Sequence, residues 1–202
     1  MSVLRYLSAS LLLSVLVLLP FQGCDVARQA TQASNLVNCD FRIRSVENVN
    51  LAGVNLQSIR SVTDLSMTDM ARIMAGFTAP TFPLSMQVNL EGKNPNTGTA
   101  GLNRIDWILF IDDIQMTSGI LNRAFTIPPK GTAIVPVEVA FDLKQVLSGK
   151  SATAMLNFCL NLAGVGGTPT RFKIKLKPTI VVAGSALRYP GFITINTSYS
   201  GK

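Results

Sequence analysis

The sequence predicts an all-β protein: an antiparallel β-sandwich with one inserted short helix and a second short helix. Seven or eight short segments alternate apolar and polar residues, which is the period of a half-buried strand. Turn residues separate these segments at short intervals, as in sandwiches. From residue 84 on, no ten-residue helical pattern lies between successive strands, which argues against a parallel α/β sheet. A hydrophobic fraction of 48% in 202 residues suits one domain of moderate size.

The composition excludes several classes of function. The chain has no histidine, so a Ser-His-Asp or Cys-His catalytic site, an imidazole metal site and a histidine pH switch are all impossible. Charged residues make up 14% of the chain, against about 25% in an ordinary soluble domain, which fits neither a disordered chain nor a coiled coil. We therefore expect no enzyme, no catalytic residue, no metal site and no cofactor.

Residues 1–23 have the pattern of a lipoprotein signal peptide. Arg5 supplies the positive start, and the apolar run over 7–19 is too short to cross a bilayer core of about 30 Å. Gly23 and Cys24 resemble the end of a bacterial lipobox, in which a small residue precedes a cysteine that is lipidated after cleavage. The alternatives are a signal anchor that is never cleaved and a chance cysteine after an unrelated cleavage site.

Lipidation of Cys24 would place the protein in the bacterial cell envelope, since several acyl chains make a stable anchor. The expected partners are then the membrane, through the N-terminal acyl anchor, and a lipid or an envelope protein. We expect the outer membrane, facing the periplasm. Asp25 resembles an inner-membrane retention signal of enterobacteria, which keeps the inner membrane as the alternative. Nucleic acid is not expected as a partner despite the net charge of +7, because an exported protein does not meet the nucleic acids of the cell.

Two further cysteines, Cys39 and Cys159, would lie in an oxidising compartment. Together they could form a disulfide that closes a long loop and stabilises the fold by a few kcal/mol, to order of magnitude. Both lie in apolar, strand-like segments, so two buried free thiols are the alternative.

The chain after the signal divides into a tether and one domain. Residues 24–38 are polar with small side chains and no strong period, which predicts a flexible tether. The domain spans 39–202. Its first strand begins at Cys39, where Phe41 and Ile43 alternate with arginines.

Residues 64–76 form the clearest helical pattern. Ser66 and Asp69 have the spacing of a capping box, and Gly76 suits the C-terminal stop. Its apolar stripe comprises Met67, Met70, Ile73, Met74 and Phe77. We interpret the stripe as the face of a helix that plugs the end of a sheet; the alternative is an adaptable binding surface, as methionines can form.

The other elements follow in chain order. Strands are expected over 84–90, 105–111, 119–125, 132–141, 152–162, 171–182 and 192–199, with a short helix over 143–147. Pro128–Gly131 is a strong turn signal. Trp107 alternates with Asp106 and Ile108 along its strand and, with Ile105 and Leu109, is expected in the core.

The middle of the chain resembles a known family. Residues 84–96 end in Asn94-Pro95-Asn96, and this strand and turn are similar to the signature of type-2 late embryogenesis abundant (LEA) proteins, also called the WHy domain. The strand over 105–111 and the Ser118-Gly119 hairpin follow in the family's order, and the resemblance covers roughly residues 40–182. It implies an immunoglobulin- or fibronectin-III-like sandwich without a known active site. It also implies roles in stress tolerance, in protecting proteins or membranes and, for some members, in lipid binding.

Two local patterns suggest chemistry but have simpler interpretations. Asp112-Asp113 could be a paired carboxylate site, but adjacent strand residues point to opposite faces, so we predict a hairpin tip. The glycines of 164–167 lack the lysine and the helix of a phosphate-binding loop, so we predict a hairpin loop.

A third pattern is a row of positive charges on one predicted strand. The row comprises Arg171, Lys173, Lys175 and Lys177, which alternate with apolar residues. One interpretation is contact with anionic lipid headgroups, worth about 1 kcal/mol per charge near the surface. The other is that lysines protect an edge strand from pairing with other chains.

These observations lead to a function without catalysis. We expect a membrane-anchored LEA-type lipoprotein that binds or protects envelope components under stress. The alternative is a module that binds or transfers lipids or other hydrophobic ligands in the envelope. A continuous apolar cleft lined by Met67, Met70 and Met74 would favour the alternative, and a filled core would favour the first.

Overall fold

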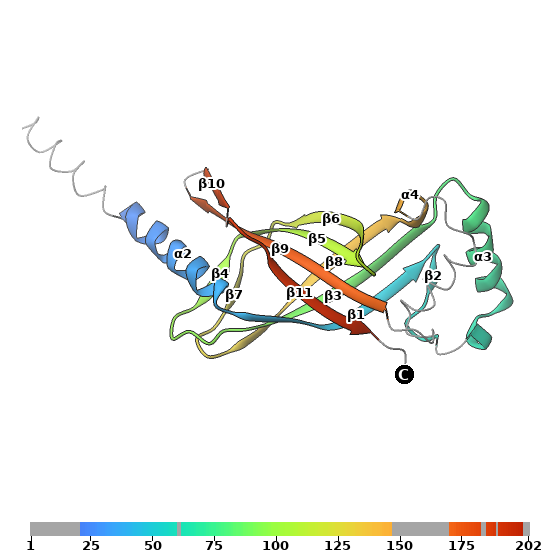
Figure 1. The fold of residues 1–202 in the computed structure, drawn as a ribbon, viewed down its shortest axis with the longest axis horizontal. Helices are drawn as coiled ribbons and strands as arrows, with labels where there is room; N and C mark the ends of the chain where they lie inside the picture. Colours follow the sequence, from blue (N-terminus) through green and yellow to red (C-terminus); the bar gives the residue numbers. More distant parts are fainter. Residues whose placement is uncertain (1–20, 60–61, 147–169, 183–184, 189, 200–202) are drawn as a thin grey trace, which may run out of the picture.

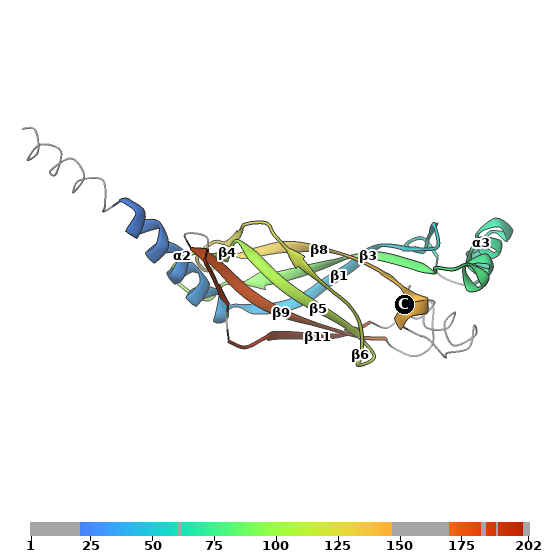
Figure 2. The ribbon, with the colours of Figure 1, turned by 90° about the horizontal axis from the view of Figure 1, so that it is seen from above.

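Two antiparallel sheets face each other and enclose one hydrophobic core (Figures 1 and 2). The structure is a computed structural model that describes residues 21–59, 62–146, 170–182, 185–188 and 190–199. This architecture confirms the predicted all-β sandwich with a few short helices. Among the helices in those ranges, none is both long enough and apolar enough to cross a bilayer.

The first sheet has the strand order β2-β1-β3-β8. Its strands are β2 (Val54–Asn55), β1 (Asp40–Leu51), β3 (Pro83–Lys93) and β8 (Thr132–Asp142). The strands predicted over 84–90 and 132–141 are thereby confirmed. In β3, Leu84 and Val88 are fully buried while Ser85 is exposed, so the alternating pattern of the sequence sets which face lies inside.

The second sheet has the order β10-β9-β5-β6, and β11 also pairs with β9. Its strands are β10 (Ser185–Arg188), β9 (Thr170–Val182), β5 (Arg104–Ile111), β6 (Ile114–Leu121) and β11 (Ile193–Tyr199). A small separate ladder pairs β4 (Ala100–Leu102) with β7 (Phe125–Ile127). The strands predicted over 105–111, 171–182 and 192–199 are confirmed.

The strand predicted over 119–125 is wrong in its extent. Strand β6 already begins at Ile114, because a two-residue turn lets it pair with β5 at once. It ends at Leu121, and Phe125 starts the separate strand β7. Strands β4 and β10 were not predicted, since three or four residues are too few to show a period. The strand predicted over 152–162 lies outside the described residues.

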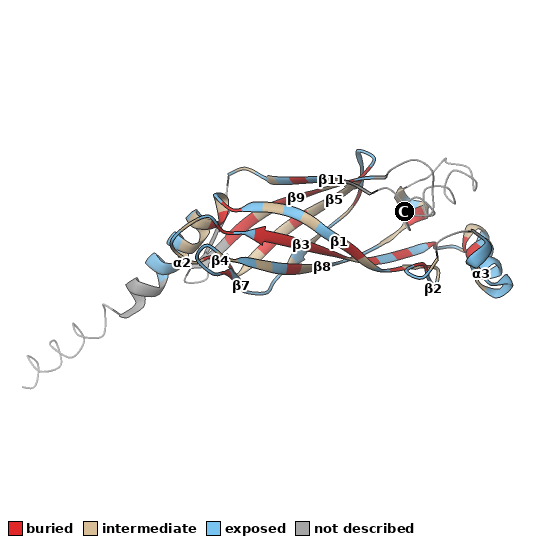
Figure 3. Cartoon of the chain, turned by 90° about the horizontal axis from the view of Figure 1, so that it is seen from below, coloured by how far each residue is buried: buried red, intermediate tan, exposed pale blue. Residues whose placement is uncertain are grey.

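Side chains from both sheets fill the space between them. Figure 3 shows buried residues alternating with less buried ones along strands of both sheets. Fully buried side chains of the first sheet include Leu84 and Leu90, and those of the second include Leu109 and Ile111. Trp107 is 6% exposed, which confirms its predicted place in the core.

The segment over 24–38, predicted to be a flexible tether, is instead mostly helical. Helix α2 (Phe21–Val37) reaches the sandwich, where Leu36 is buried in the core. The Asn35 amide donates a hydrogen bond to the Thr99 carbonyl at 3.0 Å. Alanine, arginine and glutamine favour helix, and docking of the last turn stabilises a helix that is marginal alone. The sequence shows no helical period here because, among the described side chains of the helix, only Leu36 near its end is buried.

The helix predicted over 64–76 is confirmed, although it starts and ends a few residues later in the chain. Helix α3 covers Met67–Thr78, and Ser66 caps it by accepting a hydrogen bond from the Asp69 amide at 3.0 Å. A 3-10 turn, η1 (Val62–Asp64), precedes it. The short helix predicted over 143–147 is α4 (Leu143–Val146). Figure 1 shows α3 at the end of the molecule opposite α2.

Candidate functional site

Strand β9 presents a row of positive side chains on the outer face of the second sheet. This basic row consists of Arg171, Lys173, Lys175 and Lys177. The intervening Phe172, Ile174 and Leu176 are at most 2% exposed and lie in the core. The row therefore faces outward, and the alternation predicted from the sequence is confirmed.

The interpretation of these lysines as guards of an edge strand is wrong. Strand β9 is an inner strand of its sheet, paired with β5 on one side and with β10 and β11 on the other. The backbone groups on both sides therefore belong to ladders within the sheet, and no free edge needs protection here. The basic row lies on a face of the sheet.

A hairpin tip lies beside the basic row. Asp112 and Asp113 join β5 to β6, and Ile111 pairs directly with Ile114. Both aspartates have positive φ, 48° and 65°, as a two-residue type I′ turn requires. The predicted hairpin tip is confirmed. Aspartate tolerates this left-handed conformation better than most residues.

The carboxylates of the hairpin tip neutralise the end of the basic row that contains Arg171. Arg171 Nε lies 3.5 Å from Asp112 Oδ1, and Arg171 Nη2 lies 3.3 Å from Asp113 Oδ2. The Lys173 ammonium donates a hydrogen bond to Asp113. This hydrogen bond, followed by the charges of Lys173 and Arg171, lowers the pKa of Asp113. Asp113 thus stays negatively charged at neutral pH.

The other two lysines lie over aromatic rings. The Lys175 ammonium is 5.1 Å from the centre of the Phe110 ring, and the Lys177 ammonium is 5.2 Å from that of Phe192. Both distances suit a cation–π interaction. In the described part of the chain, neither ammonium forms an ion pair with a carboxylate. These charges are therefore held in place without being neutralised.

An open hollow of about 620 Å³ lies beside the hairpin tip, at the end of the basic row that contains Arg171. Its lining residues are Asp113, Arg171, Phe172, Lys173, Asn196 and Thr197. An anion entering the hollow would meet two cations, but it would have to displace Asp113 from both.

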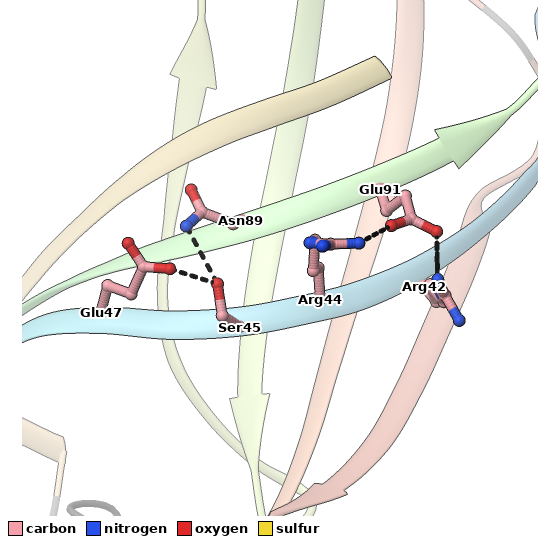
Figure 4. Close-up of polar contacts among 6 residues, drawn as sticks. All are labelled: Arg42, Arg44, Ser45, Glu47, Asn89 and Glu91. Atoms are coloured by element: carbon pink, nitrogen blue, oxygen red, sulfur yellow. Dashed lines mark hydrogen bonds and ion pairs between the residues drawn. The ribbon is translucent and has the colours of Figure 1, made fainter. Parts of the chain in front are cut away.

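A second charged cluster lies on the outer face of the first sheet (Figure 4). Glu91 is largely buried and accepts hydrogen bonds from Arg42 Nε at 2.6 Å and Arg44 Nη1 at 2.5 Å. Arg42 pairs with Glu91 in the ladder, and an irregularity between Ile43 and Ser45 lets Arg44 reach the same carboxylate. The Arg44 hydrogen bond is the largest of the contributions that lower the pKa of Glu91, with burial opposing it.

The polar side chains continue along the same two strands. The Asn89 amide donates to Ser45 Oγ at 3.0 Å, and Ser45 Oγ donates to Glu47 at 2.6 Å (Figure 4). This network was not predicted from the sequence. Its bonded partners on β1 and β3 lie more than forty residues apart in the sequence, and only the pairing of the two strands brings them together.

Replacing Glu91 by glutamine is expected to remove the stabilisation of the fold that comes from the ionised Glu91 carboxylate and depends on pH. Because folding lowers the pKa of Glu91 below its usual value of 4.5, this stabilisation is complete above that pH. It is lost as the pH falls through the lowered pKa. Glu91→Gln should therefore melt at a lower temperature than the wild type near neutral pH, and the difference should shrink on acidification.

Thermal melting of the full chain at a series of pH values measures this difference. The control is Glu138→Gln, at an exposed position on neighbouring β8, for which the difference should stay small throughout. A gap between Glu91→Gln and wild type that widens on acidification would contradict the expected ion pair.

The Asn94-Pro95-Asn96 turn has a structural role. Asn94 is 1% exposed, and its amide nitrogen donates to the carbonyls of Gly98, Ile127 and Pro128 at 2.9–3.1 Å. Its side-chain oxygen accepts from the Asn96 backbone amide at 2.9 Å. The Asn96 side chain donates to the Asn35 carbonyl in α2 at 2.8 Å. The turn thus joins the small β4–β7 ladder and α2 to the sandwich.

The methionine stripe of α3 does not plug a sheet. Met67, Met70 and Met74 are 86%, 39% and 53% exposed. Only Ile73 is buried, and Phe77 packs partly against the core. The favoured interpretation of the stripe was wrong because the helix lies beyond the end of the sandwich (Figure 1). Two hollows on the described surface are lined by other residues.

The cysteines are placed only in part. Cys39 is a buried free thiol that donates to the Asn35 carbonyl at 3.4 Å, and burial raises its pKa. Cys159 lies outside the described residues, as does the loop over 164–167. Cys24 lies in α2.

The described residues contain no group of three or more Cys, Asp or Glu side chains that could hold a metal ion. In the described part of the chain, the charged clusters on the two outer faces are the candidate sites. The fold and site thus define an all-β sandwich protein with a basic outer face on one sheet and an Arg–Glu cluster on the other.

Comparison with known families identifies the chain further. Residues 89–189, half of the chain, match the model of the late embryogenesis abundant protein family LEA_2, and the chain belongs to that family. The resemblance read from the Asn94-Pro95-Asn96 turn is thereby confirmed. Membership points to a stress-related protein of a generally non-enzymatic family. No curated protein matches the chain.

Three solved structures are similar to this chain. A crystal structure of a protein from Archaeoglobus fulgidus is 10% identical, with a TM-score of 0.34, and the match covers 61% of this chain and 89% of that one. A solution structure from Arabidopsis thaliana is 12% identical, with a TM-score of 0.37, covering 58% and 70%. A solution structure of a late embryogenesis abundant (LEA) protein is 16% identical, with a TM-score of 0.37, covering 96% and 83%.

Proposed function

We propose that this chain is a lipoprotein of the bacterial cell envelope, anchored by acyl chains on Cys24, whose LEA-type sandwich binds or protects envelope components under stress. The basic row on the outer face of β9 is the observation that carries the proposal. It is a group of four outward-facing cations on an inner strand, where protection of a sheet edge does not explain them. A face of this kind suits anionic lipid headgroups.

Helix α2 also supports the proposal. It includes Cys24 and ends where Leu36 enters the core and Asn35 bonds to Thr99. At 1.5 Å per residue, the part of the helix after Cys24 spans roughly 20 Å. An acyl anchor on Cys24 would thus be joined to the sandwich by a helix, which restricts the faces that can reach the bilayer. We place the protein on the outer membrane, facing the periplasm.

Cys24→Ser is expected to abolish lipidation. The thiol is the acyl acceptor in the proposed modification, so the variant should yield no acyl-modified N-terminal peptide and should not be cleaved after Gly23. The measurement is mass spectrometry of the N-terminal peptide from isolated membranes of a Gram-negative host.

Cys39→Ser is the matched control, because Cys39 is a buried thiol within the domain. It should leave the modified peptide intact. The lipoprotein proposal would be refuted by two results together: the wild type yields an N-terminal peptide without acyl groups, and Cys24→Ser stays in the membrane fraction.

A further inference from the structure

The charge of the basic row is distributed unequally along β9. At the end nearer the start of the strand, Arg171 and Lys173 face Asp112 and Asp113 within ion-pair distance. Two cations therefore meet two carboxylates, and this half has no net charge.

The half nearer the end of β9 keeps its positive charge. Lys175 and Lys177 have no carboxylate partner in the described part of the chain. On the neighbouring strand, Asp106 lies opposite Lys177 in the ladder, but it is bonded to Arg104 at 3.0 Å. Three cations and one carboxylate leave an excess of two positive charges.

Exposed apolar side chains flank this charged half. Phe192, 47% exposed, lies under the Lys177 ammonium. Ile120, 55% exposed, pairs with Asp106 on the far side of β5. Lysines next to an exposed aromatic ring and an exposed aliphatic side chain suit the headgroup region of a bilayer. There the ammonium groups meet phosphates, and the apolar side chains enter the interface. A small soluble anion would leave Phe192 and Ile120 unused.

The same half lies toward the proposed anchor. Figures 1 and 2 both show the C-terminal end of β9 and strand β10 at the end of the molecule where α2 docks. The neutralised half, with Arg171, lies toward the other end. Charge, apolar exposure and position thus coincide on one half of the face.

We propose that this half, formed by Lys175, Lys177, Phe192 and Ile120, rests on the anionic headgroups of the bilayer that holds the Cys24 anchor. The inference depends on the proposed function and narrows it. The hairpin tip acts as an internal counter-ion: Asp113 occupies Arg171 and Lys173 and keeps them from the lipid. The sandwich therefore contacts the membrane along one defined half of one sheet.

Lysine labelling of the full lipidated chain in vesicles tests the inference. The chain is reconstituted into phosphatidylcholine vesicles with or without phosphatidylglycerol, and the labelling rate of each lysine is read by mass spectrometry. We expect phosphatidylglycerol to slow the labelling of Lys175 and Lys177 by about fivefold, equivalent to about 1 kcal/mol per lysine. Lys173, and Lys93 on the other sheet, should change less than about twofold, and salt should reduce the protection.

Two matched variants test the inference further, and in both the measured quantity is the protection from labelling that phosphatidylglycerol gives Lys175. Lys177→Gln removes a proposed lipid contact and should reduce the protection of Lys175 by several-fold, whereas Arg171→Gln removes a neutralised charge and should leave it within about twofold. Asp113→Asn should extend the protection to Lys173, because it releases that ammonium for the lipid.

The outcomes separate the two proposals. If the chain floats with vesicles but Lys175 and Lys177 are no better protected than Lys173, or Arg171→Gln acts like Lys177→Gln, this inference is wrong and the anchor stands. If the wild-type chain does not float with either kind of vesicle, the proposed anchor is wrong, and the inference falls with it.

Discussion

Replacing Asn94 by alanine is expected to destabilise the fold more than any other single change considered for the loops. The substitution removes the amide that now bonds to three carbonyls, the buried one of Ile127 and the partly buried ones of Gly98 and Pro128. Each unsatisfied buried polar group costs about 1–3 kcal/mol, so we expect a loss of roughly 3 kcal/mol. For a chain of this size, that lowers the melting temperature by roughly 6–12 °C.

Asn94→Asp should be at least as damaging as Asn94→Ala. It keeps the shape of the side chain but places a carboxylate oxygen against three carbonyl oxygens. Thr97→Ala, at an exposed position of the same turn, should change stability by less than about 0.5 kcal/mol. Melting of the full chain followed by circular dichroism measures all three. An Asn94→Asp variant as stable as the wild type would show that the amide hydrogen bonds do not hold this turn.

Replacing Gly119 by valine is expected to displace the single tryptophan of the chain. A Cβ atom at Gly119 would lie 2.4 Å from Cζ2 of the Trp107 ring, much closer than van der Waals contact. The buried indole must therefore move, and overpacking of this kind costs about 1–3 kcal/mol. Because the chain has one tryptophan, its fluorescence reports on this site alone and should shift to longer wavelength.

Ser118→Val is the matched control for Gly119→Val. Ser118 is exposed and points to the outer face, opposite Ile108. The same side chain added there should leave the emission of Trp107 unchanged and the stability nearly so. Equal red shifts in the two variants would mean that the close approach of the indole to Gly119 does not explain the effect.

Some features of the basic row could be predicted from the sequence, and others could not. The outward direction of the four cations followed from the alternation in β9, which is a local property of any strand. Their neighbours did not follow, since Asp113 lies sixty residues away from Lys173. The edge-strand interpretation failed for the same reason, because a strand's sequence does not tell whether β10 and β11 cover its side.

The helices show the same division. The Ser66 cap and the helical period predicted α3 correctly, because caps and periodicity are local. The burial of its methionines was predicted wrongly, since an apolar stripe does not say whether a partner surface exists. Helix α2 was missed because, among its described side chains, Leu36 alone lies in the core, and one buried position leaves no period to detect.

The sequence by itself determined the β-sandwich class, the Asn94-Pro95-Asn96 turn and the outward direction of the basic row. These depend on side-chain alternation and on turn residues, which act over a few neighbouring positions. Only the tertiary structure decided that Asp112 and Asp113 neutralise one half of the row and that Arg42 and Arg44 share Glu91. These contacts depend on which strands pair and in which register, and both are set by packing across the whole domain.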